Sequence, residues 1–309
     1  MIRLILNRLA TGVFVLWGAV TLMFVLLRLA PGDPASLILG ADATPEQMAE
    51  LRASMGLDDS MIVQYLRYLG DAFRLDFGTS FRFAAPAMSV VTSRLGATIA
   101  LTLAATVIAV VIGLTLGVLA GRNPGSAVDR ITSTISVFCQ AMPTFWIGIM
   151  LILVFTVQLH ILPSSGAGTF QQLIMPACTL AMPFIAIVAR ICRSSVAESM
   201  SAGYIDTARS KGDTEGQVVV GHALRNSLGP VVTVVGLQMG ALLGGAVVVE
   251  NVFAWPGLGS LIVQSVSYRD YSVVQAAALL IAGFVVLLKL ATDISYGAID
   301  PRVRVEGRS

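Results

Sequence analysis

The stretch that decides the fold runs from Glu198 to Pro230 and reads ESMSAGYIDTARSKGDTEGQVVVGHALRNSLGP. It is a polar island, and the apolar segment on each side of it is long enough to cross a bilayer. Residues 204–211 predict a short helix, because Gly212 supplies the left-handed residue that commonly follows a helix C-terminus. The sequence therefore predicts a loop at one membrane surface that presents a short helix.

The predicted short helix has an apolar side and a charged side. Ile205 and Ala208 lie one turn apart, and Asp206, Arg209 and Lys211 surround them. A helix of this kind is suited to insertion into a groove of another protein, so we expect Ile205 and Ala208 to pack against a partner.

The composition places the chain in a membrane. Of its 309 residues, 56% are hydrophobic and 12% are charged, and the mean hydropathy is +0.82. A formal net charge of +2 gives no reason to expect a nucleic-acid partner. The cysteines are Cys139, Cys178 and Cys192, an odd number within apolar segments, so neither a disulfide framework nor a metal site is expected.

Six apolar runs are long enough to span the hydrocarbon layer, which needs about 20 residues at 1.5 Å per residue. We expect the first run to be a retained span, since it is longer than the apolar region of a signal peptide. The predicted spans are 9–29, 95–120, 131–159, 173–191, 231–249 and 273–294. The fold class predicted from these runs is an all-α integral membrane protein.

Lysine and arginine gather in alternate connecting segments, which predicts that both termini and residues 198–230 are cytoplasmic. The resulting segments are a first transmembrane helix at 1–30, an extracytoplasmic segment at 31–94, a core of helices at 95–296 and a cytoplasmic tail at 297–309. Within residues 31–94, Thr44-Pro45-Glu46-Gln47 predicts a helix start, and residues 61–75 predict a second helix. A cover packed on the spans is favoured over a substrate site for this segment.

Glycine and proline predict how the spans pack. Gly113, Gly117 and Gly121 form one ridge of small residues, and residues 236, 240 and 244 form another. Either ridge could pack inside the chain or face a second subunit. Pro143, Pro176 and Pro183 are expected to kink their helices.

A second motif follows the fifth span, on the side opposite to the polar loop. It reads Glu250-Asn251-Val252-Phe253-Ala254-Trp255-Pro256-Gly257-Leu258-Gly259. From the residues alone, Trp255 is an aromatic anchor at the membrane interface and Pro256-Gly257 forms a turn. A carboxylate at membrane depth is rare and usually faces protein or water, so Glu250 is a candidate for the translocation path.

Both motifs resemble binding-protein-dependent ABC importer permeases, in the branch that transports dipeptides, oligopeptides and nickel. The loop is similar to the family's E-A-A-x-x-x-G core, with Asp206 in place of the glutamate and Gly203 where the branch usually has a capping aspartate. The residues that match the family's ATPase-coupling loop, within 193–229, are Tyr204, Ile205, Asp206, Thr207, Ala208, Arg209, Lys211, Gly212, His222, Arg225 and Asn226.

The second motif resembles the family's E-x-V-F-x-x-P-G-L-G sequence, which implies a re-entrant turn near the outer end of the path. The candidate outer-gate residues are Glu250, Phe253, Trp255, Pro256, Gly257 and Gly259.

The resemblance implies a type I importer fold and a set of partners. These are a second homologous permease, two ABC ATPases, an extracytoplasmic solute-binding protein and the bilayer of the bacterial inner membrane. The chain has no G-x-x-x-x-G-K-[ST] motif, so ATP and magnesium are expected on the ATPases and no cofactor on this chain. A bulky residue at Gly212 is expected to abolish coupling.

No catalytic residues are expected, because His160 and His222 fall at opposite ends of the predicted helices and neither can pair with the same serine. The function predicted from the resemblance is the permease subunit of an ATP-driven importer of di- and oligopeptides. A nickel importer and a stand-alone secondary transporter are the alternatives, although the latter requires ionisable groups in mid-membrane, and the spans hold few.

Overall fold

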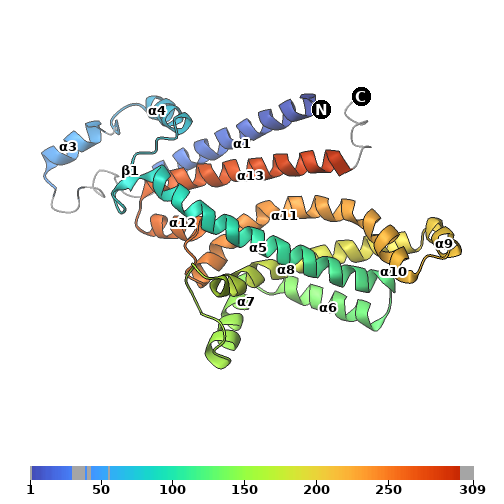
Figure 1. Cartoon of the computed structure of the whole chain (residues 1–309). Coiled ribbons are helices and arrows are strands. Elements are labelled where there is room, and N and C mark those ends of the chain that lie inside the picture. Colours follow the sequence, from blue (N-terminus) through green and yellow to red (C-terminus); the bar gives the residue numbers. More distant parts are fainter. Residues whose placement is uncertain (1, 30–38, 40–42, 55, 300–309) are drawn as a thin grey trace. The chain divides into compact units, whose positions relative to one another are not determined.

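The computed structural model describes residues 2–29, 39, 43–54 and 56–299, and this part of the chain is almost entirely helical (Figure 1). The exception in the described part is a hairpin of two short antiparallel strands, β1 and β2. In chain order the elements are α1 (Ile2–Leu29), α3 (Pro45–Ser54), α4 (Met61–Phe73), β1 (Thr79–Ser80), β2 (Ala85–Pro86), α5 (Ala87–Arg122), α6 (Ala127–Ala141), α7 (Thr144–Leu151), η1 (Ile152–Gln158), α8 (Phe170–Met200), α9 (Gly203–Ser210), α10 (Glu215–Gln217), η2 (Val218–Leu224), α11 (Arg225–Val252), α12 (Leu258–Ser267) and α13 (Tyr271–Ile299).

Two compact units divide the chain. The first consists of residues 1–4, 96–260 and 287–309, and the second of residues 5–95 and 261–286. Residues 31–34 and 300–309, which the sequence assigns to the extracytoplasmic segment and the cytoplasmic tail, lie outside the described residues.

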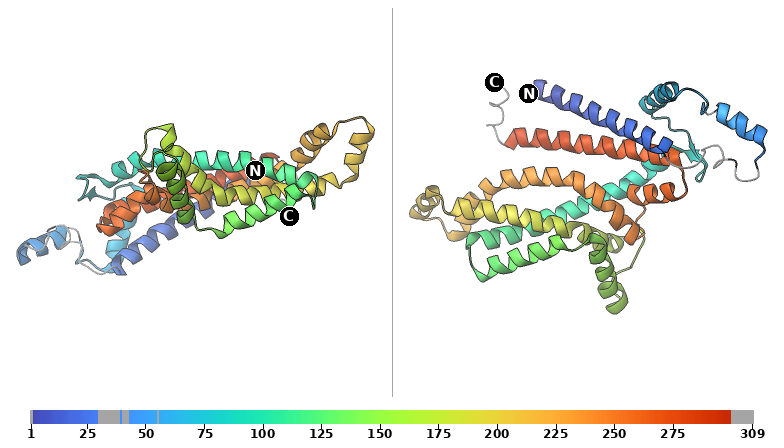
Figure 2. Two further views of the ribbon diagram at one scale, coloured as in Figure 1. Left: turned by 90° about the horizontal axis from the view of Figure 1, so that it is seen from below. Right: turned by 180° about the vertical axis from the view of Figure 1, so that it is seen from behind.

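Five helices in the described part are long and apolar enough to cross a membrane, and they include five of the six predicted spans. The predicted third span, 131–159, is wrong as a single helix, because α6 and the α7–η1 segment meet at an angle of 104° (Figure 2). Proline disfavours helical geometry in the residue before it, and Met142 is extended, with φ −80° and ψ 131°. The expected kink at Pro143 is therefore confirmed as a sharp break.

The other two prolines behave differently. Helix α8 continues through Pro176 and Pro183, and a kink at either residue stays a prediction. Its N-terminus carries a capping box, in which Thr169 and Gln172 bond to each other's backbone N–H groups. Tertiary packing holds α8 together, since Pro176, Phe184 and Val188 are among its many buried residues.

The first glycine ridge packs α5 against α8 inside the first unit. A Cβ added at Gly113 would lie 2.7 Å from Val188 Cβ, and one added at Gly117 would lie 2.5 Å from Cys192 Cβ. Both partner side chains are fully buried. The small residues therefore let the two backbones approach, which is how helices associate where lipid offers no hydrophobic drive.

The second ridge has two different environments. A Cβ added at Gly236 would lie 1.8 Å from Thr292 Cγ2 of α13, whereas nothing lies within 4 Å of one added at Gly244. Gly236 thus packs within the chain, and a contact of Gly244 with a second subunit stays a prediction.

Within the second unit, the Thr44–Gln47 capping box that precedes α3 is confirmed: Gln47 Oε1 accepts from Thr44 N at 3.0 Å, and Thr44 Oγ1 accepts from Gln47 N at 3.3 Å. Helix α4 ends at Phe73, two residues earlier than predicted. One side of it packs on α1, where Tyr65 contacts Thr21 and Phe24, whereas Ile62 is 72% exposed and Phe73 is 86% exposed.

The hairpin is tied to the start of α13 in the second unit. The hydroxyl of Ser80 donates to the carboxylate of Asp270, and both residues are buried. Next to this pair, the guanidinium of Arg82 stacks on Tyr268 with 3.6 Å between its central carbon and the ring centroid. These contacts hold the β1–β2 hairpin against the residues that directly precede α13.

Candidate functional site

Helix α9 is the short helix that the sequence predicts in the polar loop. It follows directly from α8 after a turn at Ser201, and its N-cap is Ala202, which makes no side-chain bond to the helix. Gly203 is the first helical residue, so the assignment of Gly203 to the capping position is wrong by one residue. Because no side chain caps its first turn, α9 depends on other contacts for its position.

The apolar side of α9 is buried inside the loop itself. Ile205 is 0% exposed and Ala208 is 6% exposed, and both pack against Val218 of η2, with Met200 of α8 beside them. The expectation that Ile205 and Ala208 form a free contact face is therefore wrong. They anchor α9 to its own chain, because burial there removes their apolar surface from water.

Gly212 ends the short helix in the conformation that the sequence predicts. Its φ is +92°, and its N–H donates to Arg209 O at 3.0 Å. Nothing lies within 4 Å of a Cβ added at this position. The need for glycine here is therefore conformational and not steric within this chain.

Charged side chains brace α9 against α10. Arg209 Nε donates to Glu215 Oε1 at 2.8 Å, and Arg209 Nη1 lies 3.5 Å from Asp206 Oδ1. The hydrogen bond from Arg209 to Glu215 raises the pKa of the guanidinium above its ordinary value. The charge of Arg209 is thus largely satisfied inside the loop.

Two further side-chain bonds connect α9 and its C-terminal turn to η2 and to the start of α11. His222 Nε2 lies 3.0 Å from Asp213 Oδ2, and Asn226 Nδ2 donates to Tyr204 Oη at 2.8 Å. The bond between Tyr204 and Asn226 joins residues 22 positions apart. The two parts of the coupling-loop motif, 204–212 and 222–226, therefore belong to one folded loop.

The π-helical turn η2 places these residues. Val218, Val219 and Ala223 are buried, while His222 is half-buried beside Asp213. Single π-turns inside helices occur often at functional sites. Here the wide turn lets Val218 reach Ile205 while His222 faces the turn after α9.

Sequence reasoning missed three residues that hold the loop, namely Glu215, Val218 and Asp213. It also missed the second capping box, Thr214 and Gln217, in which Thr214 Oγ1 accepts from Gln217 N and Gln217 Oε1 accepts from Thr214 N. That box was visible as T-E-G-Q, a threonine with glutamine three residues later.

The residues of α9 that remain at the surface are polar. The side chain of Asp206 is 81% exposed, Tyr204 is 42% exposed, and Thr207 and Lys211 are also exposed. Arg225, at the first turn of α11, is exposed as well. The loop therefore offers a rigid polar surface, which we call the α9 face and define as Tyr204, Asp206, Thr207 and Lys211.

The second motif closes around one carboxylate. Glu250 is 0% exposed, its Oε1 accepts from Thr98 Oγ1 at 2.6 Å, and its Oε2 accepts from Ser260 N at 2.9 Å. The same hydroxyl of Thr98 accepts from Leu258 N at 2.8 Å. Glu250 thus ties α5, α11 and α12 together within the first unit.

The glycines of this motif are needed where the chain wraps around Glu250. A Cβ added at Gly257 would lie 2.0 Å from Glu250 Oε1, and one added at Gly259 would lie 2.5 Å from the backbone Cα of Val247. The turn after Pro256 can therefore pack this closely on α11 only because neither position carries a side chain.

The aromatic residues of the motif are interior. Phe253 is 1% exposed and Trp255 is 5% exposed, and Trp255 Nε1 donates to Ala97 O at 2.9 Å. The interpretation of Trp255 as an interfacial anchor is wrong, because its ring lies inside the protein. Partners such as Ala97 are 158 positions away in sequence, so no local pattern indicates them.

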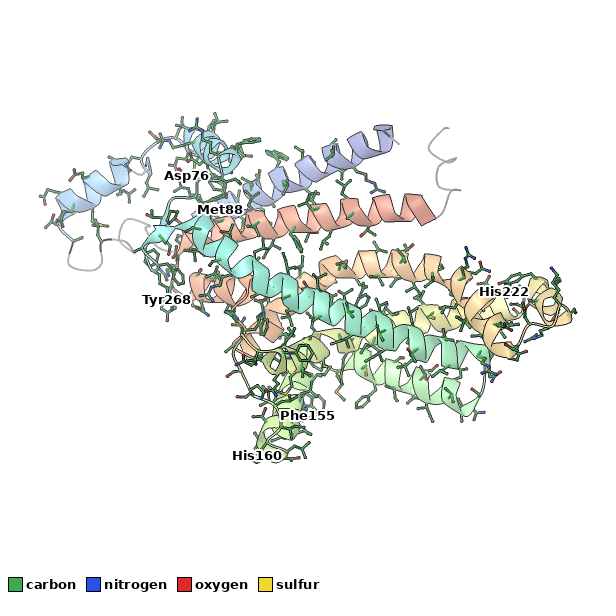
Figure 3. The ribbon with its side chains drawn as sticks, viewed as in Figure 1. Asp76, Met88, Phe155, His160, His222 and Tyr268 are labelled. Atoms are coloured by element: carbon green, nitrogen blue, oxygen red, sulfur yellow. The ribbon has the colours of Figure 1, made fainter. Side chains whose placement is uncertain are left out.

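The two histidines lie at separate ends of the first unit (Figure 3). His160 lies near the tip of the α7–η1 segment, and His222 lies in the α9 loop. Among the described residues, no group of three or more His, Cys, Asp or Glu side chains is placed to hold a metal ion.

Comparison with solved structures identifies the class of fold. The MetNI methionine ABC transporter in an inward-facing conformation matches with a TM-score of 0.58 and 24% identity over 69% of this chain and 97% of that chain. An amino acid ABC transporter crystallised with histidines matches with a TM-score of 0.51 and 20% identity, over 69% of this chain and 94% of that one. The fold is that of a type I ABC importer transmembrane domain.

Family and relatives agree with this class. Residues 113–305 match the family described as "Binding-protein-dependent transport system inner membrane component", and residues 1–102 match the N-terminal family of the same systems. The chain belongs to this family of inner-membrane components.

Two curated relatives match over nearly their whole length. The probable peptide ABC transporter permease protein y4tP of Sinorhizobium fredii is 38% identical over 308 residues, which are 97% of this chain and 98% of the relative. The glutathione transport system permease protein GsiC of Salmonella paratyphi A is 40% identical over 304 residues, which are 98% of this chain and 99% of the relative.

Membership settles several expectations. The protein is a multi-pass permease subunit of the inner membrane and is not an enzyme, and a binding-protein-dependent ABC transporter implies ATPase and binding-protein partners. The alternative of a stand-alone secondary transporter is wrong for the same reason.

Proposed function

We propose that this chain forms part of the path for di- and oligopeptides and that the α9 face docks on the ATPase that drives transport. The observation that carries the coupling role is the anchoring of α9 by buried Ile205 and Ala208, while its outer residues stay exposed. A docking helix transmits force only if it is held firmly by its own chain. In this loop a buried apolar anchor and the Arg209–Glu215 pair hold it.

The proposal of a peptide substrate is based on the two relatives. One is a probable peptide permease and the other transports glutathione, itself a tripeptide, and each aligns over almost the whole chain. Nickel is kept as the alternative substrate.

The remaining partners and topology belong to the same proposal. A second homologous permease completes the path, two ATPases bind ATP and magnesium, and both termini lie in the cytoplasm with the α9 loop. Residues 31–94 then face the exterior, where the binding protein delivers substrate. The positive-inside distribution of arginine supports this orientation.

The outer turn, residues 253–259, closes the path on the exterior in this proposal. Glu250 acts as its structural tie, since its carboxylate accepts hydrogen bonds from Thr98 and Ser260 and is fully buried. Opening of the path would then require this whole turn to move as one body.

The test of the coupling role uses the complete transporter in proteoliposomes, with labelled dipeptide, glutathione and nickel as alternative substrates. Thr207→Trp adds a large ring to the exposed α9 face without disturbing the buried anchor. Leu103→Trp is the control, since Leu103 is 49% exposed on the span α5.

We expect Thr207→Trp to lose ATP-driven uptake and co-purification of the ATPase, while Leu103→Trp keeps both. Equal uptake by both variants would refute docking through the α9 face. Uptake of nickel without uptake of either peptide would refute the substrate and leave the coupling role intact.

A further inference from the structure

A cavity of about 380 Å³ lies wholly within the second unit, between α1, α4, β1 and the start of α13. Its volume is in the range of cavities that hold small ligands. Neither the α9 loop nor the outer turn contributes to it, so the proposed transport function leaves it unexplained.

The cavity lies at the level of lipid headgroups. Arg28 is the next-to-last residue of the spanning part of α1, and Tyr271 is the first residue of the spanning part of α13, and both line it. At 1.5 Å per residue, each lies within one turn of the end of its span. The headgroup region adjoins the hydrocarbon core at this depth.

Helix α4, which forms one wall, packs on the membrane-embedded part of α1. Tyr65 Oη lies 2.7 Å from Thr21 Oγ1, and Thr21 precedes the end of α1 by eight residues, or about 12 Å. On its other side α4 exposes Ile62, Leu66 and Phe73, which are 72%, 61% and 86% exposed. An amphipathic helix at this depth has its apolar side chains among acyl chains.

The charge of the lining is positive. The lining contains three arginines, Arg28, Arg67 and Arg269, and one carboxylate, Asp71. Arg67 is already paired with Asp59 at 2.7 Å, but within the described part of the chain no ion pair joins Arg28 or Arg269. Two guanidinium groups are thus available for an anion, and arginine matches phosphate geometry well.

The lining also holds an acceptor without a donor. The side-chain amide of Gln64 donates to Leu57 O at 2.9 Å and to Asp59 O at 2.7 Å, which fixes its orientation. Its Oε1 is buried and has no hydrogen-bond partner, and the residue is only 8% exposed. That burial also shields the oxygen from the cavity, so the carboxylate of Asp71 is the group of the lining that can receive an ammonium group.

We propose that this cavity binds the headgroup of a phospholipid, with phosphatidylethanolamine preferred. Arg28 and Arg269 bind the phosphate, and Asp71 receives the ammonium group. Tyr68 adds a neutral hydroxyl, because burial raises its pKa to about 12 and keeps the proton on it. The choline headgroup fits less well, since its quaternary nitrogen carries no hydrogen to donate to Asp71.

The test is native mass spectrometry of the complete transporter, solubilised in detergent and titrated with phosphatidylethanolamine or phosphatidylcholine of the same acyl chains. We expect retention of phosphatidylethanolamine and weaker retention, by at least about tenfold, in the double variant Arg28→Gln with Arg269→Gln, which removes two charge-assisted bonds. Arg74→Gln is the matched control, because Arg74 follows α4 and does not line the cavity.

A second variant covers the case in which the double variant fails to assemble. Thr79→Trp fills the cavity from an exposed strand position without changing any charge, and we expect it to lose the lipid while retaining the partner subunits. Equal retention by Thr79→Trp and the unaltered chain would overturn the proposal, as would equal retention of the two lipids. Displacement of the lipid by a millimolar dipeptide would assign the cavity to the transported substrate and overturn it as well.

Discussion

Replacement of Gly212 tests whether the geometry of the α9 loop, and not merely its sequence, couples transport to ATP. The residue has φ +92°, and nothing lies within 4 Å of a Cβ placed there. Gly212→Val therefore introduces no clash within the chain, and its whole cost is the left-handed backbone, about 1–2 kcal/mol for a residue with a Cβ. That cost corresponds to a factor of about 5–30 in the ratio of the native to the non-native turn.

The assay is ATP-driven uptake by the complete transporter in proteoliposomes, together with its ATPase rate. We expect Gly212→Val to lower uptake by up to this factor. Gly212→Asn is expected to retain most of it, because asparagine tolerates the left-handed region. Gly216→Val is the matched control, since Gly216 also has no neighbour within 4 Å of an added Cβ but is helical.

Three results would contradict this reasoning. Unchanged uptake by Gly212→Val would show that the turn is not needed for coupling. Equal losses for valine and asparagine would indicate that the partner ATPase touches this position and that strain is not the cause. A loss at Gly216 as large as that at Gly212 would show that any side chain in the loop blocks docking.

Two further predictions concern the anchor and the outer turn. Ile205→Ala truncates a fully buried side chain and should destabilise the packing of α9 by about 2–5 kcal/mol. The loss is measured as faster amide hydrogen exchange across residues 203–210. Val220→Ala is the control and should leave the exchange unchanged, because Val220 is 63% exposed. Thr98→Val leaves Glu250 Oε1 and the Leu258 N–H without their partner, at about 1–3 kcal/mol each, and should lower the unfolding temperature of the purified complex. The control is Thr92→Val, because that hydroxyl bonds only to the backbone of its own helix; equal unfolding temperatures for the two threonine variants would contradict the role of the buried carboxylate.

Local patterns predicted most of the helical elements and the shape of the loop. Hydropathy indicated five spans correctly, since the cost of exposing polar groups to lipid acts on every residue of a span. Thr44 and Gln47 indicated a helix start, and Gly212 indicated a helix end, because caps and left-handed turns depend on residues close in sequence.

Hydropathy could not indicate the break at Pro143, because residues on both sides of it are apolar enough to continue a span. Periodicity gave Ile205 and Ala208 an apolar side, but it could not decide what covers that side. The partner turned out to be Val218 of the same loop and not another protein.

By itself, the sequence determined a multi-pass membrane protein with a polar helical loop, because these properties follow from composition and from neighbouring residues. Only the tertiary structure decided which polar and apolar side chains find their partners inside the fold. Glu250 suggested a path residue, yet its carboxylate is closed off by Thr98, 152 positions earlier in the chain. A carboxylate in a span must be satisfied by protein or by water, and only the arrangement of α5, α11 and α12 determines which of the two it meets.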